Sequence, residues 1–221
     1  MIMQNAQYLS DDQVKRIHEA SLEILRDTGL LVRNEKARIR FAEHGCEVNH
    51  ETEVVTFPAD LVEKCVEMTP PTFTICGRDP AHDFTLPCAE PRVATASSAP
   101  DMVDPVSGET RRATSHDIAR LGHLVNEMDG IDVFSISVLA DDAPEGQFNL
   151  SRFYPALKNC SKPVRTSVLD VEECEQILKL GETIAGSRED YFKHQFITFG
   201  YCAVVSPLTM DYDSTDMLMY F

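Results

Sequence analysis

The sequence has no tryptophan, no long apolar run and few positive charges. No stretch approaches the roughly 18 apolar residues of a membrane-spanning helix, and the start lacks the basic and apolar segments of a signal peptide. We therefore expect a cytoplasmic protein that does not associate with membranes. Lys and Arg number 20 against 36 Asp and Glu, for a formal net charge of −16. That charge argues against nucleic acid as a partner, because phosphate attracts clustered cations.

Motifs for zinc and for nucleotides are missing as well. The seven cysteines are scattered and form no CxxC pair, which excludes zinc ribbons and fingers. An odd, dispersed set is typical of reduced cytosolic thiols that are buried as small apolar side chains. The chain also lacks GxGxxG and Walker A loops, so no phosphate-binding loop supports a Rossmann-like sheet.

What is present begins with a helical and hairpin module over residues 1–90. Ser10-Asp-Asp-Gln13 is a capping box, and the amphipathic helix that it starts ends at Gly29. Residues 72–76 and 82–86 have strand composition and flank a turn-rich link, which predicts a hairpin. Two further helices are expected between these elements, with start signals at Asn34 and Pro58.

From residue 92 apolar strands alternate with helices, which is typical of parallel βαβ units. A full (β/α)₈ barrel takes roughly 250 residues, so residues 91–221 would form its truncated first half, about four βα units. The fold class expected is therefore α/β, a partial TIM barrel after the small module; a small open sheet is the alternative. The expected strands are 92–98, 131–139, 163–169 and 196–210, and the helices begin near Ser115, Phe148 and Val171.

Five segments follow the order and approximate spacing of a known family. They are Leu9-Ser-Asp-Asp-Gln-Val-Lys-Arg-Ile-His-Glu-Ala-Ser-Leu-Glu-Ile-Leu25, Gly77-Arg-Asp-Pro-Ala-His-Asp83, Ser97-Ser-Ala-Pro-Asp-Met-Val-Asp104, Asn159-Cys-Ser-Lys-Pro-Val164 and Ser206-Pro-Leu-Thr209. Together they resemble the trimethylamine methyltransferase family, which includes members of glycine betaine type. The helical start alone would be a weak signal, but the second and fifth segments together are fairly specific.

The resemblance implies a TIM-barrel transferase of methylamine metabolism and methanogenesis. Such an enzyme moves a methyl group from a methylated amine or quaternary ammonium to the Co(I) of a separate corrinoid protein. No cofactor would be tightly bound, because the partner protein presents the corrinoid (cobalamin). The resemblance also implies that this chain is an amino-terminal half, a truncated copy, with the family's pyrrolysine position beyond residue 221. The catalytic residues are not identified by it.

Substrate-binding residues are expected where the barrel strands end. Hydroxyl, carboxylate and aromatic side chains suit a cationic ammonium group, but serines and aspartates after strands are also ordinary loop and cap residues. Tyr201 could equally belong to the core, and Asp211 should cap a final helix. The candidates are Ser98, Asp101, Ser137, Ser167, Tyr201 and Ser206; Asp141 and Thr166 occupy comparable positions.

No metal site is expected. His116 and His123 are two helical turns apart, roughly 10 Å, too far to share an ion. His82 and Asp83 fit a structural turn, in which Arg78 could pair with an aspartate.

Two other functions stay open. One is a different TIM-barrel enzyme, a lyase or aldolase, although no expected strand carries an interior lysine for such chemistry. The other is an inactive fragment or a structural or interaction module. An open half-barrel leaves the edge of its fourth strand without a partner, so we expect either a homo-oligomer formed through that edge or a poorly soluble chain.

Overall fold

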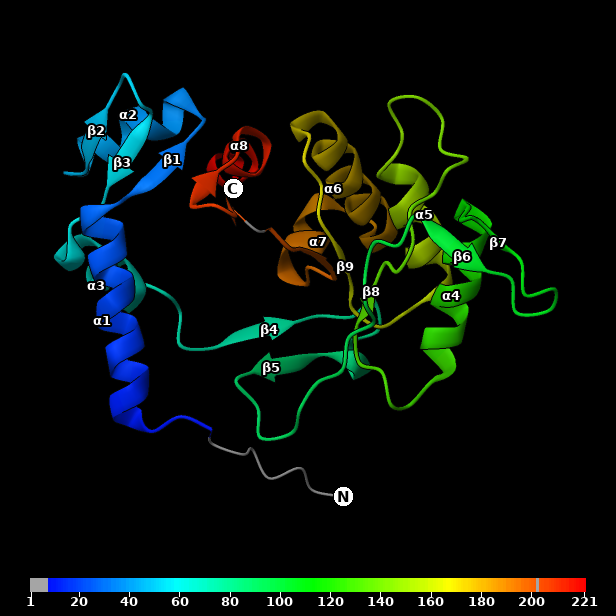
Figure 1. Cartoon of the computed structure of the whole chain (residues 1–221). Helices are drawn as coiled ribbons and strands as arrows, with labels where there is room; N and C mark the ends of the chain where they lie inside the picture. Colours follow the sequence, from blue (N-terminus) through cyan, green and yellow to red (C-terminus); the bar gives the residue numbers. More distant parts are fainter. Residues whose placement is uncertain (1–7, 202) are drawn as a thin grey trace. The chain divides into compact units, whose positions relative to one another are not determined.

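The computed structural model describes residues 8–201 and 203–221, and the chain divides into two compact units (Figure 1). The first combines the chain up to Pro70 with the segment that ends at Phe221, and the second is Pro71–Tyr201. The sequence had suggested one boundary near residue 90 instead. Over the described ranges, no helix combines the length and apolar character needed to cross a membrane.

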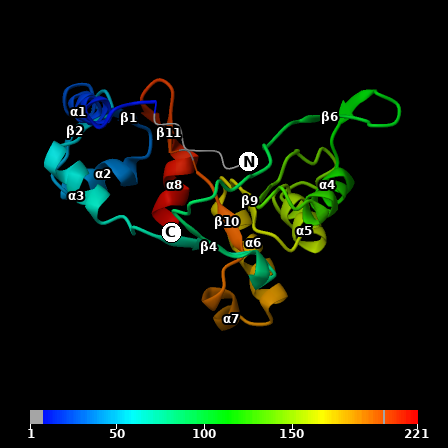
Figure 2. The same ribbon diagram turned by 90° about the horizontal axis from the view of Figure 1, so that it is seen from below.

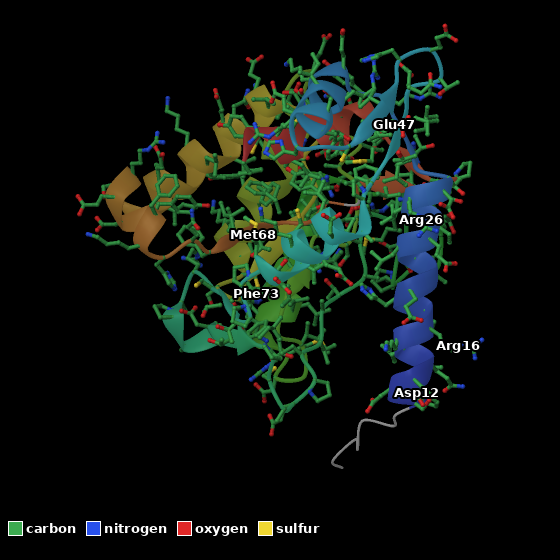
Figure 3. All side chains as sticks on the ribbon, turned by 90° about the vertical axis from the view of Figure 1, so that its left-hand side faces the viewer. Asp12, Arg16, Arg26, Glu47, Met68 and Phe73 are labelled. Carbon is green, nitrogen blue, oxygen red and sulfur yellow. The ribbon has the colours of Figure 1, made fainter. Side chains whose placement is uncertain are left out.

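Helix α1 (Asp11–Asp27) opens the first unit as the capping box predicts. The Ser10 hydroxyl accepts from Gln13 N, and the Gln13 side chain accepts from Ser10 N. No residue of the helix is fully buried, Leu25 packs against the core, and charged side chains extend from the helix in Figure 3. Gly29 ends it with a φ of +73°, and a Cβ there would lie 2.3 Å from Val55 O. Glycine is therefore required both by the left-handed backbone and by the close approach of strand β3 (Val54–Thr56).

The sheet of the first unit joins segments from both ends of the chain. Its strand order is β11-β12-β1-β3-β2, with β1 parallel to β12 and the other pairs antiparallel. The strands are β1 (Leu30–Val32), β2 (Glu47–Asn49), β3 (Val54–Thr56), β11 (Val204–Val205) and β12 (Thr209–Met210). The helices are α2 (Glu35–Glu43), α3 (Ala59–Glu67) and α8 (Tyr212–Tyr220). The core includes Leu30, Val32, Ala37 and Val55.

The prediction of one long strand over residues 196–210 is wrong. Strand β10 covers Ile197–Phe199, and β11 and β12 form a separate hairpin in the first unit. Residue 202 lies outside the described residues. Ser206-Pro207-Leu208 is the turn of that hairpin, where Leu208 has a φ of +39° and cannot continue a strand. Asp211 does cap α8, since its side chain accepts from Ser214 N at 2.7 Å.

In the second unit, the hairpin predicted around the turn-rich link is present. Strands β4 (Phe73–Ile75) and β5 (Phe84–Leu86) pair antiparallel across a short 3₁₀ turn. A second hairpin is formed by β6 (Asp101–Val103) and β7 (Thr110–Arg112), for which no strands were expected. Its tip is built by Asp104, whose side chain accepts from Val106 N and Ser107 N at 2.9 Å.

The parallel sheet of the second unit has the order β10-β9-β8, and Figure 2 shows β9 beside β10. Its strands are β8 (Phe134–Ser135), β9 (Val164–Thr166) and β10. The segment expected as the first strand forms no regular strand; it lies parallel to the residues that flank β8, through bridges from Ala94 to Val133 and from Ala99 to Val138. The helices are α4 (Ser115–Glu127), α5 (Leu150–Asn159), α6 (Val171–Ala185) and α7 (Arg188–Lys193). The fold is thus mixed α/β, and the described residues contain no closed barrel.

The buried Lys162 precedes β9 and stabilises the end of α4. Its ammonium donates to the carbonyl oxygens of Val125, Met128 and Ile131 at 3.0, 2.5 and 2.7 Å. The last carbonyls of a helix lack intrahelical donors, and a cation near them also interacts favourably with the negative end of the helix dipole. One lysine therefore fixes the turn between α4 and β8 against the start of β9.

Replacing Lys162 by methionine should destabilise the fold. Lys162→Met retains the apolar stem but removes the three hydrogen bonds that the ammonium donates to these carbonyls, so we expect the free energy of unfolding to fall by about 3 kcal/mol. Urea unfolding followed by circular dichroism measures this. Lys158→Met, at an exposed position on α5, is the control and should change stability by less than about 0.5 kcal/mol. Equal midpoints for the two variants would contradict the assignment.

Asp117 is a buried carboxylate at the start of α4. Arg111 binds it with two nitrogens at 2.7 and 2.8 Å, and the Thr114 amide and hydroxyl donate to it at 2.9 Å. The arginine, together with the Thr114 hydrogen bonds, holds the pKa of Asp117 well below its usual range. Hairpin β6–β7 is thereby tied to the helix that follows it.

The stability due to Asp117 should depend on pH. When folding lowers the pKa of a carboxylate, the stability that it contributes is fully present above its pKa in the unfolded chain, about 3.9. That stability is lost as the pH falls toward and through its pKa in the folded protein. We expect Asp117→Asn to lower the free energy of unfolding by about 2 kcal/mol at pH 7. The deficit should shrink below about pH 4. Asp129→Asn, at an exposed position, serves as control, and a deficit independent of pH would refute the linkage.

Candidate functional site

The carboxyl ends of the parallel strands bring several of the expected polar residues together. Ser98 follows the first segment, is half-buried and has a φ of +128°. Ser137 follows β8, and its hydroxyl donates to Ser135 O at 3.1 Å while Ala99 N donates to its carbonyl at 2.9 Å. Thr166 is buried at the end of β9. Ligands of parallel α/β sheets bind at this edge.

Arg152 of α5 connects these strand ends. Its Nη2 donates to Thr166 Oγ1 at 2.6 Å and to Ser98 Oγ at 3.3 Å, and its Nη1 donates to Asn149 Oδ1 at 3.2 Å. The residue is only 3% exposed. The planar guanidinium reaches the first and third parallel segments at once, which a lysine could not do. Arg152 therefore fixes the relative positions of the side chains that line this edge.

The charge of Arg152 is balanced indirectly. Burial lowers the pKa of its guanidinium to about 10, and the negative charge of Glu173 partly opposes that effect. Asn149 lies between them, since its amide donates to the Glu173 carboxylate on α6. The guanidinium carbon also lies 5.2 Å from the centre of the Phe148 ring. Arg152 is thus a buried cation that is connected to the negative charge of Glu173 through the neutral side chain of Asn149.

Aromatic rings gather at the end of β10. Tyr201 stacks on Phe199 with ring centres 6.5 Å apart and an interplanar angle of 29°. Phe199 in turn meets Phe153 edge-on at 5.9 Å. Burial raises the pKa of Tyr201 to about 12, so its hydroxyl is neutral at physiological pH. Neutral aromatic faces of this kind can hold an organic cation.

The other expected site residues lie elsewhere or make no described contact to this edge. Asp101 is exposed in β6 and pairs with Arg112 at 3.3 Å. Asp141, also exposed, pairs with the same arginine at 3.4 Å. Ser206 lies in the hairpin turn of the first unit, and Ser167 is half-buried just after β9.

A second polar group surrounds Asp83. The expected pairing with Arg78 is replaced by other contacts: Asp83 Oδ1 accepts from Gly77 N at 2.9 Å, and Asp83 Oδ2 meets His194 Nε2 at 2.8 Å. Cys76 lies beside them. Burial, followed by the carboxylate, raises the pKa of its thiol, which makes it a poor nucleophile.

Arg152, Asn149 and Glu173 were missed as site residues from the sequence. The available signal was a cation on an apolar helix face, because Arg152 lies four residues from both Phe148 and the buried Ala156. An arginine at such a position can also bury only its apolar stem and keep its charged head group in water. Only the contacts to Ser98 and Thr166, 54 and 14 residues away in sequence, distinguish the two cases.

A parallel sheet with polar side chains collected at its carboxyl edge places the second unit among α/β domains with an enzyme-type site. The family follows from comparison. The model of the trimethylamine methyltransferase family (MTTB) matches residues 2–221, so the chain belongs to that family.

Individual relatives agree with this assignment. A trimethylamine methyltransferase of Desulfitobacterium hafniense (strain DSM 10664 / DCB-2) is 26% identical over 210 residues, covering 95% of this chain and 42% of the relative. One from Methanosarcina mazei is 33% identical over 156 residues, 68% of this chain and 31% of the relative. A glycine betaine methyltransferase of Desulfitobacterium hafniense (strain Y51) is 24% identical over 96% of this chain and 44% of its own length. The chain thus spans less than half of these curated relatives.

Arg152 should be important for the stability of the strand edge. Arg152→Ala removes the donors to Thr166, Ser98 and Asn149, and we expect the free energy of unfolding to fall by about 3 kcal/mol. Arg152→Lys should recover only part of this loss, because one ammonium cannot span the same partners.

Urea unfolding measures both variants, with Arg120→Ala at an exposed position of α4 as the control. Full rescue by lysine would show that charge alone, without the guanidinium geometry, is sufficient.

Proposed function

We propose that this chain forms part of a methyltransferase that moves a methyl group from a methylated amine or quaternary ammonium to the Co(I) of a corrinoid protein. The observation that carries the proposal is the family match over residues 2–221. The names of the relatives supply two candidate donors, trimethylamine and glycine betaine. Such an enzyme would act in methylamine metabolism, and in methanogenesis where the host carries that pathway.

The chemistry places modest demands on the protein. Methyl transfer to Co(I) requires the ammonium group to be held in line with the metal, and the corrinoid supplies the nucleophile when its carrier protein docks. On this proposal Phe199 and Tyr201 face the cationic head group, while Ser98 and Thr166, fixed by Arg152, shape the neighbouring wall. The stacking of Tyr201 on Phe199 supports this role, because the two rings present adjacent aromatic faces to a cation.

The order of the strands supports a barrel course for the second unit. The segments containing Ala94, β8, β9 and β10 are adjacent in chain order and parallel. A doubly wound sheet would reverse its order at a switch point, and no reversal occurs among these segments. We infer that they follow the start of a (β/α)₈ barrel, whose further strands would complete the substrate pocket and the surface that receives the corrinoid protein.

A lyase or aldolase is less well supported. Such enzymes use a lysine amine as the nucleophile. The buried lysine among the described residues is Lys162, and three backbone carbonyls already occupy its ammonium.

The proposal predicts methylation of a corrinoid protein. The 221-residue chain, and a version continued through the remaining length of the relatives, would be mixed with Co(I) corrinoid protein and one donor, either trimethylamine or glycine betaine. Conversion to methyl-Co(III) is followed by absorption. We expect transfer by the longer version, and for Tyr201→Ala a rise in KM of about tenfold; Tyr201→Phe should remain near wild type. Absence of transfer with both donors and both chains would refute the function and favour an inactive or structural module.

A further inference from the structure

A group of three potential metal ligands lies apart from the strand edge. Cys76 Sγ, a carboxylate oxygen of Asp83 and a ring nitrogen of His194 all lie within 4.8 Å of one another. They come from the end of β4, the turn before β5 and the residue after α7. His194 and Asp83 are 111 residues apart in sequence, so the fold, not a local motif, assembles the group.

The donor set matches a borderline-soft divalent cation. Thiolate, imidazole and carboxylate are the ligands of zinc, and zinc sites with three protein ligands keep a fourth position for water. A thiolate and a carboxylate would neutralise the two charges of the ion. Tetrahedral coordination at ordinary zinc–ligand lengths requires donor separations of roughly 3.3–3.6 Å. The three donors lie within 4.8 Å of one another, and ion binding would require the 2.8 Å contact between His194 and Asp83 to open.

Two of the ligands, Asp83 and His194, are positioned by neighbouring groups. Asp83 Oδ1 accepts a hydrogen bond from Gly77 N, and this contact directs Oδ2 toward His194. Gly77 itself permits this turn, since a Cβ there would lie 2.8 Å from Ser161 O. His194 follows the buried Tyr191, and its ring lies 6.5 Å from that of the buried Phe196. Contacts to residues around the ligands fix the orientation of the ligands in metal sites.

The group is accessible to ions from solution. The side chains of His194 and Asp83 are 31% and 25% exposed. Asp83 also borders a cavity of about 190 Å³, whose lining includes the carboxylates of Asp129 and Asp132 and the cations of Arg92 and Lys162.

We propose that Cys76, Asp83 and His194 form a binding site for Zn²⁺ or a similar divalent transition-metal ion. The site joins hairpin β4–β5 to the end of α7. It uses no residue of the strand edge, so it is independent of the proposed methyl transfer.

Titration of the purified, chelator-treated 221-residue chain with Zn²⁺ tests the site. Calorimetry should show one saturable equivalent. Co²⁺ as a probe should produce a thiolate-to-cobalt charge-transfer band in the near ultraviolet. Cys76→Ser and His194→Ala should each weaken Zn²⁺ binding by at least about tenfold, and Cys76→Ser should abolish the band. Asp83→Asn retains the acceptor for Gly77 N but loses the charge, and should weaken binding with the fold intact.

Neighbouring residues of the same kind provide controls. Cys88→Ser and His82→Ala alter another thiol and another imidazole of the second unit and should bind Zn²⁺ as the wild type does. Far-ultraviolet circular dichroism verifies the folding of every variant. Failure of the folded wild type to bind Zn²⁺ would overturn the proposal. So would Zn²⁺ binding by folded Cys76→Ser and His194→Ala at the wild-type affinity.

Discussion

Burial of the Arg152 cation is the constraint on which the strand edge of the second unit depends. An ion removed from water loses several kcal/mol of solvation, and the protein must replace it with hydrogen bonds and nearby charge. Ser98, Thr166 and Asn149 provide the hydrogen bonds, and Glu173 provides the charge. Because these groups come from two strand segments and two helices, the hydrogen bonds of one guanidinium fix the arrangement of all of them, although its Nε has no hydrogen-bond partner among the described residues.

The same principle acts at other places in this unit. Lys162 stabilises the carbonyls at the end of α4, and Arg111 pairs with Asp117 at its start. In each case a long cationic side chain connects a helix terminus to a segment that is distant or differently folded. These contacts compensate for parallel strands that are only two or three residues long, too short to define the unit through their ladders alone.

Local chemistry made much of the fold predictable. The caps at Ser10, Asn34 and Asp211 were found because capping depends on a few adjacent residues. The strand ends were harder, since their lengths depend on tertiary pairing. The strand expected at 196–210 failed because the hairpin β11–β12 finds a partner in β1, nearly 180 residues earlier in register (Leu31 with Thr209). Arg152 and His194 were missed as site residues for the same reason: their partners are remote in sequence.

The pairing of β1 with β12 also determines when the first unit can be completed. Its sheet needs residues 30–32 and 209–210, while the whole of Pro71–Tyr201 is synthesised between them. During translation, the second unit therefore emerges from the ribosome and can begin to fold before the first unit receives its last strands. Until then β1 presents an open edge to the cell. The sheet of the first unit therefore cannot be completed until the carboxyl-terminal hairpin has been synthesised.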